Sequence, residues 1–142
     1  MWQFPWTTLW SKSEVLIRTK KKTYSLDNME ELFNDLGSPE GWEMYKNLEP
    51  FMTNLEDPGV PVYCIYGVGF KTVESIYYSG SILDSFTKAK CGNGDGIVNL
   101  RSFEVCKQWK NAEVKPFWGV NHFTIQSNSR VIEYIIEQIN KS

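Results

Sequence analysis

The chain has 142 residues, of which 42% are hydrophobic and 15% aromatic, and its formal net charge is −2. A chain of this length and composition can bury the core of a globular domain. The charge gives no reason to expect a nucleic-acid partner, and no apolar stretch approaches the ~18–20 residues of a membrane span. The aromatic segment 1–10 lacks the basic and apolar regions of a signal peptide, so we expect it to be the interior of a longer chain.

The first predicted elements are a basic turn and a helix. The one basic run, residues 20–22, is expected to be a solvated strand end or turn. Residues 26–36 carry apolar side chains at three- and four-residue steps, which predicts one buried helical stripe. Ser25 is the expected N-cap, Asn28 stands at N3 without forming a capping box, and Gly37 follows the last turn.

A break, a second helix and a strand are expected next. Residues 38–41 interrupt the helical pattern, and a helix then runs from residue 42 towards residue 53, bent or shortened by Pro50. Residues 57–59 (Asp-Pro-Gly) predict a turn. Residues 60–66 are apolar nearly throughout, which is typical of a strand covered on both faces in a parallel sheet.

The second half of the chain continues the alternation of strands and helices. Residues 72–78 predict a strand or hairpin arm, 79–90 a surface loop, 99–109 a helix, 115–120 a short strand, and 130–140 a strongly amphipathic final helix. This order indicates an α/β fold. Two or three strands are too few to complete a stable covered sheet, and no repeat or linker suggests a second domain.

The most informative pair of residues is Asp95, in the glycine-rich segment 91–98, and His122, the only histidine. Hydrolases of the Ser-acid-His type need an acid that orients an imidazole and an imidazole that moves the proton of the nucleophile. In α/β-hydrolases the acid and then the histidine follow the serine along the chain. No Gly-x-Ser-x-Gly occurs in the 142 residues, so a catalytic pair here would make this chain the back half of an enzyme.

Other interpretations of these residues remain open. Asp95 can be a turn residue, because Asn-Gly and Asp-Gly favour tight turns, and a lone histidine can be structural. Residues 93–99 also partly fit a calcium loop of the EF-hand type. That loop should begin with an acid and end with a bidentate glutamate, whereas Cys91 and Ser102 stand there, so calcium binding is the weaker alternative.

The three cysteines are Cys64, Cys91 and Cys106. They contain no Cys-x-x-Cys, and a single histidine cannot complete an ordinary Cys/His zinc site. Either all three are buried thiols, or two form a disulfide and one is left over.

Several separated segments resemble one known family in the correct order. They are residues 61–69, 75–78, 92–102 and 106–109, with further matches at 24–26, 32–33 and 41–42. Together they are similar to the C-terminal half of the lecithin–cholesterol acyltransferase family, most closely to its lysosomal phospholipase/acyltransferase branch. The family pattern Gly-Asp-Gly-Asp-Gly-Thr-Val is changed here at Asn93 and Ile97, whereas Asp95 is retained.

The resemblance implies a fold and a site. Residues 1–142 would form the C-terminal portion of an α/β-hydrolase domain, with an incomplete sheet and flanking helices. Asp95 would be the triad acid and His122 the base, with no metal or cofactor. The two side chains would meet at hydrogen-bonding distance, ~2.6–3.2 Å, across the ends of neighbouring strands. Cys64 and Cys106 would form a disulfide that contributes ~3–4 kcal/mol in the loop-entropy picture, and the third cysteine would be unpaired.

The resemblance also implies an activity. The intact protein would be a lipid-metabolising serine hydrolase and O-acyltransferase, a phospholipase A and transacylase acting on glycerophospholipid esters. Water or a lipid alcohol would accept the acyl group. The protein would act peripherally at a membrane or lipoprotein surface, and its location would be lysosomal or extracellular. This chain alone would be inactive, because the serine is absent. The alternative is a catalytically inactive lipid-binding or interaction remnant of the same fold.

Overall fold

The computed structural model describes residues 8–53 and 55–141, so the first seven residues of the aromatic N-terminal segment lie outside it. The chain divides into two compact units. Unit 1 falls within residues 1–56 and 74–91, and unit 2 within residues 57–73 and 92–142. Strands β4 (Phe70–Tyr77) and β5 (Lys88–Gly94) have residues in both units.

Unit 1 begins with a short hairpin. Strand β1 (Ile17–Arg18) pairs antiparallel with β2 (Thr23–Tyr24). The lysine run forms the turn between them, where the Thr19 hydroxyl oxygen accepts hydrogen bonds from the backbone N–H groups of Lys21 and Lys22. The expectation of a solvated strand end or turn is therefore confirmed.

The predicted helix 26–36 is present as a 3₁₀ turn, η1 (Leu26–Asn28), followed by α1 (Met29–Asp35). The expectation that no capping box forms here was wrong. The backbone N–H of Ser25 donates to Oδ1 of Asn28 at 2.8 Å, so an asparagine completes the box that glutamate or glutamine usually completes. Gly37 has φ = 69°, as expected for a residue that ends a helix in the left-handed region.

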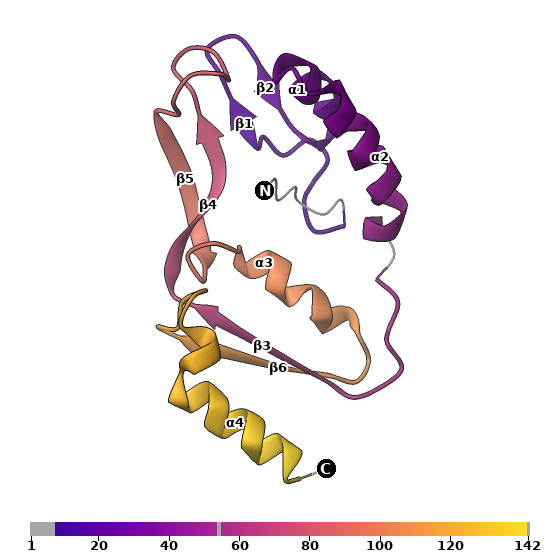
Figure 1. Ribbon diagram of the computed structural model, residues 1–142, viewed down its shortest axis with the longest axis vertical. Coiled ribbons are helices and arrows are strands. Elements are labelled where there is room, and N and C mark those ends of the chain that lie inside the picture. Colours follow the sequence, from indigo (N-terminus) through magenta and orange to yellow (C-terminus); the bar gives the residue numbers. More distant parts are fainter. Residues whose placement is uncertain (1–7, 54, 142) are drawn as a thin grey trace. The chain divides into compact units, whose positions relative to one another are not determined.

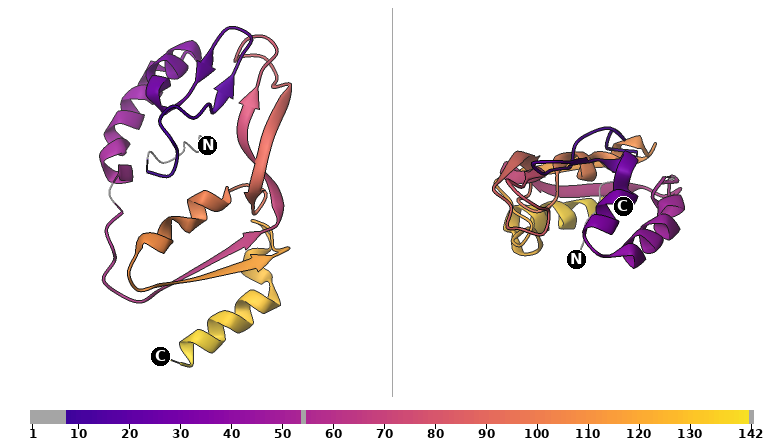
Figure 2. Two further views of the ribbon diagram at one scale, coloured as in Figure 1. Left: turned by 180° about the vertical axis from the view of Figure 1, so that it is seen from behind. Right: turned by 90° about the horizontal axis from the view of Figure 1, so that it is seen from above.

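Helix α2 (Pro39–Thr53) begins three residues earlier than predicted. The expected break is therefore present but falls at residues 36–38, between α1 and α2. Residues 39–41 start α2, because proline at the first helical position has the right φ and lacks only an N–H that would have no partner there. The helix continues through Pro50 to residue 53. Figures 1 and 2 show α1 and α2 following each other in unit 1.

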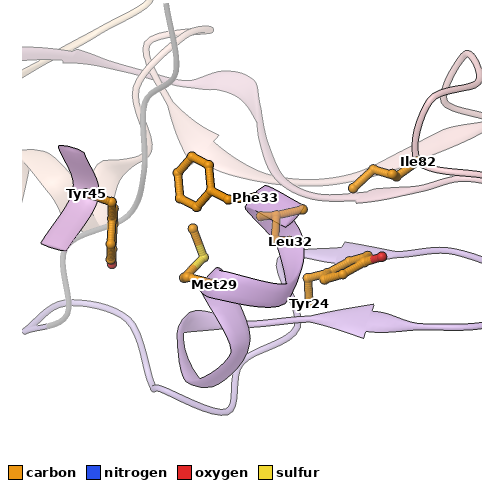
Figure 3. Close-up of a cluster of buried hydrophobic side chains, with 6 residues drawn as sticks. All are labelled: Tyr24, Met29, Leu32, Phe33, Tyr45 and Ile82. Carbon is orange, nitrogen blue, oxygen red and sulfur yellow. The ribbon is translucent and has the colours of Figure 1, made fainter. Parts of the chain in front are cut away.

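The core of unit 1 lies between α1, α2, β2 and the loop after β4. Figure 3 shows its six buried side chains: Tyr24, Met29, Leu32, Phe33, Tyr45 and Ile82. The ring of Phe33 packs against those of Trp42 and Tyr45 at centroid distances of 6.3 and 6.1 Å. The apolar stripe predicted for α1 is thus buried against the next helix.

The larger sheet has the strand order β2-β1-β4-β5, with β1 parallel to β4. The predicted strand 72–78 corresponds to β4, but the predicted loop 79–90 ends at residue 87, because β5 begins at Lys88. The β5 sequence Lys-Ala-Lys-Cys-Gly-Asn-Gly has no β-branched residue, so its extended form depends on pairing with its neighbour rather than on intrinsic propensity.

Unit 2 is built on a second sheet, in which β3 (Val62–Val68) and β6 (Ala112–Trp118) are parallel along their whole length. They lie side by side in both views of the ribbon (Figures 1 and 2). The parallel arrangement was expected, but complete burial of the strand was not correct: Tyr63 is 40% exposed, and only the C-terminal end from Tyr66 to Val68 is buried. A two-stranded sheet leaves the N-terminal half of β3 partly uncovered.

The helices of unit 2 follow the predicted pattern. Helix α3 (Leu100–Phe103) continues as the 3₁₀ turn η2 (Glu104–Gln108), and η3 (Ile125–Ser127) precedes α4 (Ser129–Ile139). Phe117, Val120 and Val131 form the buried cluster that holds α4 to the end of β6. No helix in the described part of the chain is long and apolar enough to cross a membrane.

Candidate active site

The loop that follows β5 is folded around the carboxylate of Asp95. Oδ1 of Asp95 accepts hydrogen bonds from the backbone N–H groups of Ile97 (3.0 Å) and Val98 (2.8 Å). Gly96 has φ = 97°, a conformation that glycine adopts without strain. The turn chemistry of Asp and Gly predicted from the sequence therefore exists, and it holds the carboxylate in one orientation.

A buried threonine on β4 supports the same loop. The backbone N–H of Gly96 donates to Oγ1 of Thr72 at 3.0 Å, and the side chain of Thr72 is fully buried. A Cβ added to Gly94 would lie 2.5 Å from this oxygen and 2.2 Å from the carbonyl oxygen of Val98, so only glycine fits there. Thr72 lies 23 positions before Asp95 in the sequence, and no local pattern identifies it.

The two departures from the family pattern leave this arrangement intact. Oδ1 of Asn93 accepts a hydrogen bond from the backbone N–H of Gly69 at 2.9 Å, a bond that an aspartate oxygen could also accept. Ile97 contributes its backbone N–H to Asp95, and its side chain is exposed. Neither substitution removes a contact that orients the acid.

His122 lies two residues beyond Val120, after the end of β6. Oδ1 of Asn121 accepts from the backbone N–H groups of Phe123 (2.9 Å) and Thr124 (3.0 Å), which fixes the turn that carries the imidazole. The backbone N–H of His122 donates to the carbonyl oxygen of Asp95 at 3.0 Å. The two segments are thus joined by their backbones as well as by their side chains.

The imidazole meets the carboxylate directly: Nδ1 of His122 and Oδ2 of Asp95 are 2.8 Å apart. The predicted contact at hydrogen-bonding distance is confirmed. The expectation that the two residues extend from neighbouring strands was wrong, because β5 and β6 belong to different sheets. The catalytic role of the pair stays a prediction.

One glycine, which the sequence did not single out, allows the histidine segment to approach. A Cβ on Gly67, near the end of β3, would lie 2.0 Å from the carbonyl oxygen of Val120 and 3.5 Å from Cβ of Asp95. No side chain larger than hydrogen can occupy this position while Val120 stays in place. Gly67 lies within the segment 61–69 that carries the family resemblance, which was the available signal.

The two side chains of the pair differ in their exposure to solvent. The Asp95 side chain is 4% exposed and that of His122 is 42% exposed. An ionised carboxylate only accepts hydrogen bonds, so in this pairing Nδ1 carries the proton and Nε2 presents its lone pair. Nε2 has no hydrogen-bond partner among the residues that the structure describes. The arrangement can therefore accept a proton at Nε2 and stabilise the resulting imidazolium.

The cysteines pair as the resemblance implied. Cys64 in β3 and Cys106 in η2 form a disulfide with Cα atoms 6.6 Å apart, and Cys91 is a free, exposed thiol. The bridge ties η2 to the sheet that leads to the site.

The described residues contain no group of three or more His, Cys, Asp or Glu side chains arranged to hold a metal ion. In the candidate calcium loop, one oxygen of Asp95 accepts backbone N–H groups and the other contacts His122. Both oxygens are therefore already engaged within the protein.

Parallel strands with flanking helices, and an acid–imidazole pair in loops beyond strand ends, define a mixed α/β chain of the kind found in part of an α/β-hydrolase. The family model for lecithin:cholesterol acyltransferase matches residues 1–131. The chain belongs to the lecithin:cholesterol acyltransferase family.

Individual relatives agree with this assignment. The chain is 31% identical to the lysosomal phospholipase A and acyltransferase of Canis lupus familiaris and 32% identical to that of Bos taurus. Each alignment is 139 residues long and covers 94% of this chain and 34% of the relative. The chain is 32% identical to the phosphatidylcholine-sterol acyltransferase of Gallus gallus in an alignment 130 residues long, which covers 87% of this chain and 32% of that protein. The chain spans about a third of the length of the curated relatives it matches.

Proposed function

We propose that this chain supplies the acid and the base of a lipid O-acyltransferase and phospholipase of the Ser-Asp-His type. The observation that carries the proposal is the 2.8 Å contact between Nδ1 of His122 and Oδ2 of Asp95, which leaves Nε2 open. Membership of a family of lipid acyltransferases supplies the class of reaction.

In the proposed reaction, a serine from outside these 142 residues attacks the ester carbonyl of a glycerophospholipid. Nε2 of His122 accepts the serine proton as the serine–acyl bond forms, and it then donates this proton to the departing lysophospholipid oxygen. Water or a lipid alcohol attacks the acyl-enzyme in the second half, again giving its proton to Nε2, which returns it to the serine. Asp95 keeps the proton of the neutral imidazole on Nδ1 and stabilises the imidazolium in both halves.

The surroundings of the imidazole support a lipid substrate. The ring of Phe123 contacts the imidazole edge-on at a centroid distance of 5.5 Å, and its side chain is exposed. Trp118, at the end of β6, is exposed as well. Large exposed aromatic side chains near a base favour an apolar substrate or a membrane or lipoprotein surface over a small polar molecule.

The disulfide supports an oxidising location for the protein. Bridges between cysteines persist in extracellular and other oxidising compartments and are rare where thiols are kept reduced. The mammalian relatives named above include proteins called lysosomal. We therefore propose a lysosomal or extracellular site of action.

Activity of the protein as the cell makes it tests the proposal. Fatty-acid release from phosphatidylcholine, and acyl transfer to a lipid alcohol, should fall about 10⁴-fold in Asp95→Asn and by a similar or larger factor in His122→Gln. Glu133→Gln is the matched control, because this exposed carboxylate on α4 lies outside the site. Variants at Asp95 and His122 that keep the parent rate would refute the assignment, and a parent without turnover would favour the inactive remnant.

The purified 142-residue chain alone should not turn over phospholipid, because no Gly-x-Ser-x-Gly is present to supply the nucleophile. Removing the serine of a triad costs about 10⁶ in kcat in one serine protease. Turnover by the isolated chain that disappears in His122→Ala would show that another residue in it acts as the nucleophile.

A further inference from the structure

Unit 1 contains an open groove of about 700 Å³ that shares no residue with the acid–imidazole pair. It is lined by β1 and the segment that leads into it, by the C-terminal half of β4 and by the start of β5. Charged side chains enter it from all three: Glu14 and Arg18, Glu74, and Lys88 with Lys90. Figure 1 shows β4 and β5 running side by side.

Two of the cations in the groove are available to a ligand. The guanidinium of Arg18 is exposed and has no side-chain partner among the described residues. The ammonium of Lys88 lies 5.3 Å from the centre of the Tyr77 ring, with no carboxylate partner in the described part of the chain. By contrast, Lys22 in the same unit is held by Asp35 at 2.6 Å.

The donor chemistry of these side chains matches a phosphate. A guanidinium presents its N–H groups as a planar fork that binds two phosphate oxygens at once, and an ammonium adds a point charge. An ammonium held against an aromatic ring is placed without losing its remaining donors.

The net charge of the groove indicates whether a phosphate monoester or a phosphodiester fits it better. Three cations and two carboxylates line it, a net charge of +1. One of these cations, Lys90, is paired with Glu74 at 3.2 Å, and Glu74 is only 17% exposed. A singly charged phosphodiester matches the net charge of +1, whereas the charge of a doubly charged phosphate monoester exceeds it.

The rest of the lining is apolar. Val15, Ile76 and Ala89 contribute aliphatic surface, and the Tyr77 ring adds an aromatic face. A free inorganic anion gains nothing from such surface, whereas the glycerol and acyl carbons next to a lipid phosphodiester do.

We propose that this groove binds the phosphodiester of a glycerophospholipid head group, with Arg18 and Lys88 as the cations that contact it. The choice of a glycerophospholipid rests on the proposed function. The groove would attach the protein to a lipid surface, or hold a lipid, through unit 1 residues that do not include the acid–imidazole pair.

Calorimetric titration of the purified chain tests the proposal with three probes. Dihexanoyl phosphatidylcholine below its micelle concentration should bind saturably. Inorganic phosphate and dihexanoylglycerol, which lack the lipid and the phosphate respectively, should each bind at least tenfold more weakly. Equal binding of inorganic phosphate would overturn the lipid assignment, and equal binding of dihexanoylglycerol would overturn the phosphate contact.

Variants then locate the site. Arg18→Gln should weaken phosphatidylcholine binding about tenfold or more, because it removes a charge-assisted contact, and Arg18→Lys should give an intermediate affinity because the charge stays but the fork is lost. Lys20→Gln, an exposed lysine of the hairpin turn outside this groove, should bind like the parent. Unchanged affinity in Arg18→Gln, or no saturable binding by the parent, would overturn the proposal.

The same titration separates this proposal from the proposed function. His122→Gln should bind dihexanoyl phosphatidylcholine with the parent affinity, since His122 does not line the groove. Acyl transfer is measured on the protein as the cell makes it. If that protein transfers acyl groups but shows no saturable phosphatidylcholine binding in the groove, only the groove proposal fails; if the groove binds phosphatidylcholine but that protein has no acyl transfer, only the proposed function fails.

Discussion

Reduction of the Cys64–Cys106 bridge should destabilise unit 2 by a predictable amount. The two cysteines are 42 positions apart in the sequence and join β3 to η2. In the loop-closure model, a cross-link over about 40 residues removes chain entropy from the unfolded state worth about 4 kcal/mol at 25 °C. The bridged and reduced chains have the same atoms apart from two hydrogens, so packing changes contribute little.

Hydrogen exchange at the amides of β3 and β6 measures this effect in the right unit. A loss of about 4 kcal/mol raises the open population about a thousandfold, and exchange of the slowest amides accelerates by the same factor. The paired strands β3 and β6 contain the backbone hydrogen bonds that open with the unit. Addition of reductant to the folded chain is the perturbation. The Cys64→Ala/Cys106→Ala chain also lacks the bridge, but it additionally loses the buried sulfur of Cys106, so its loss of stability should be larger.

Cys91→Ala is the matched control, because this thiol is free and exposed. It should leave exchange in unit 2 within the range of an ordinary surface substitution, about 0.5 kcal/mol. Exchange rates in β3 and β6 that do not change on reduction would refute the claim that the bridge stabilises unit 2.

Two further changes test the local interactions. Thr72→Val leaves the backbone N–H of Gly96 without its acceptor, so we expect a loss of about 1–3 kcal/mol in urea unfolding, with Thr72→Ser close to the parent. The hydrogen bond from Lys22 holds the pKa of Asp35 below its usual range, so this carboxylate stabilises the fold above about pH 4 and loses its contribution as the pH falls through the lowered pKa. Asp35→Asn should flatten the acid limb of the stability profile, and an unchanged limb would contradict the ion pair.

Sequence patterns predicted the elements that carry a clear signal in their own residues, either apolar periodicity or a run of charge. The apolar steps of helix 26–36 and of the final helix gave α1 and α4 within a few residues. The lysine turn was predicted from charge alone. Strand β5 was missed because its own seven residues include no β-branched or aromatic side chain, so its extended form depends on pairing with β4.

The residues that carry the chemistry of the candidate site could be predicted from the sequence, whereas the residues that position them could not. Asp95 and His122 carry the chemistry, and their residue types and order identify them without a structure. Thr72 and Gly67 position the two segments through contacts with residues that are distant in sequence. Oγ1 of Thr72 accepts a hydrogen bond from the backbone N–H of Gly96 at 3.0 Å, and Gly67 leaves the space that the backbone of Val120 occupies. Such roles depend on the three-dimensional approach of backbones, which no local pattern records.

The protonation of the single histidine tests the central claim most directly. In a chain labelled with ¹⁵N-histidine, only His122 gives imidazole signals, because no other histidine is present. If Asp95 orients the ring, the neutral imidazole should be protonated at Nδ1 and carry its lone pair at Nε2, and Asp95→Asn should shift this balance. A mixture of tautomers that Asp95→Asn leaves unchanged would contradict the assignment of Asp95 and His122 as an acid–base pair.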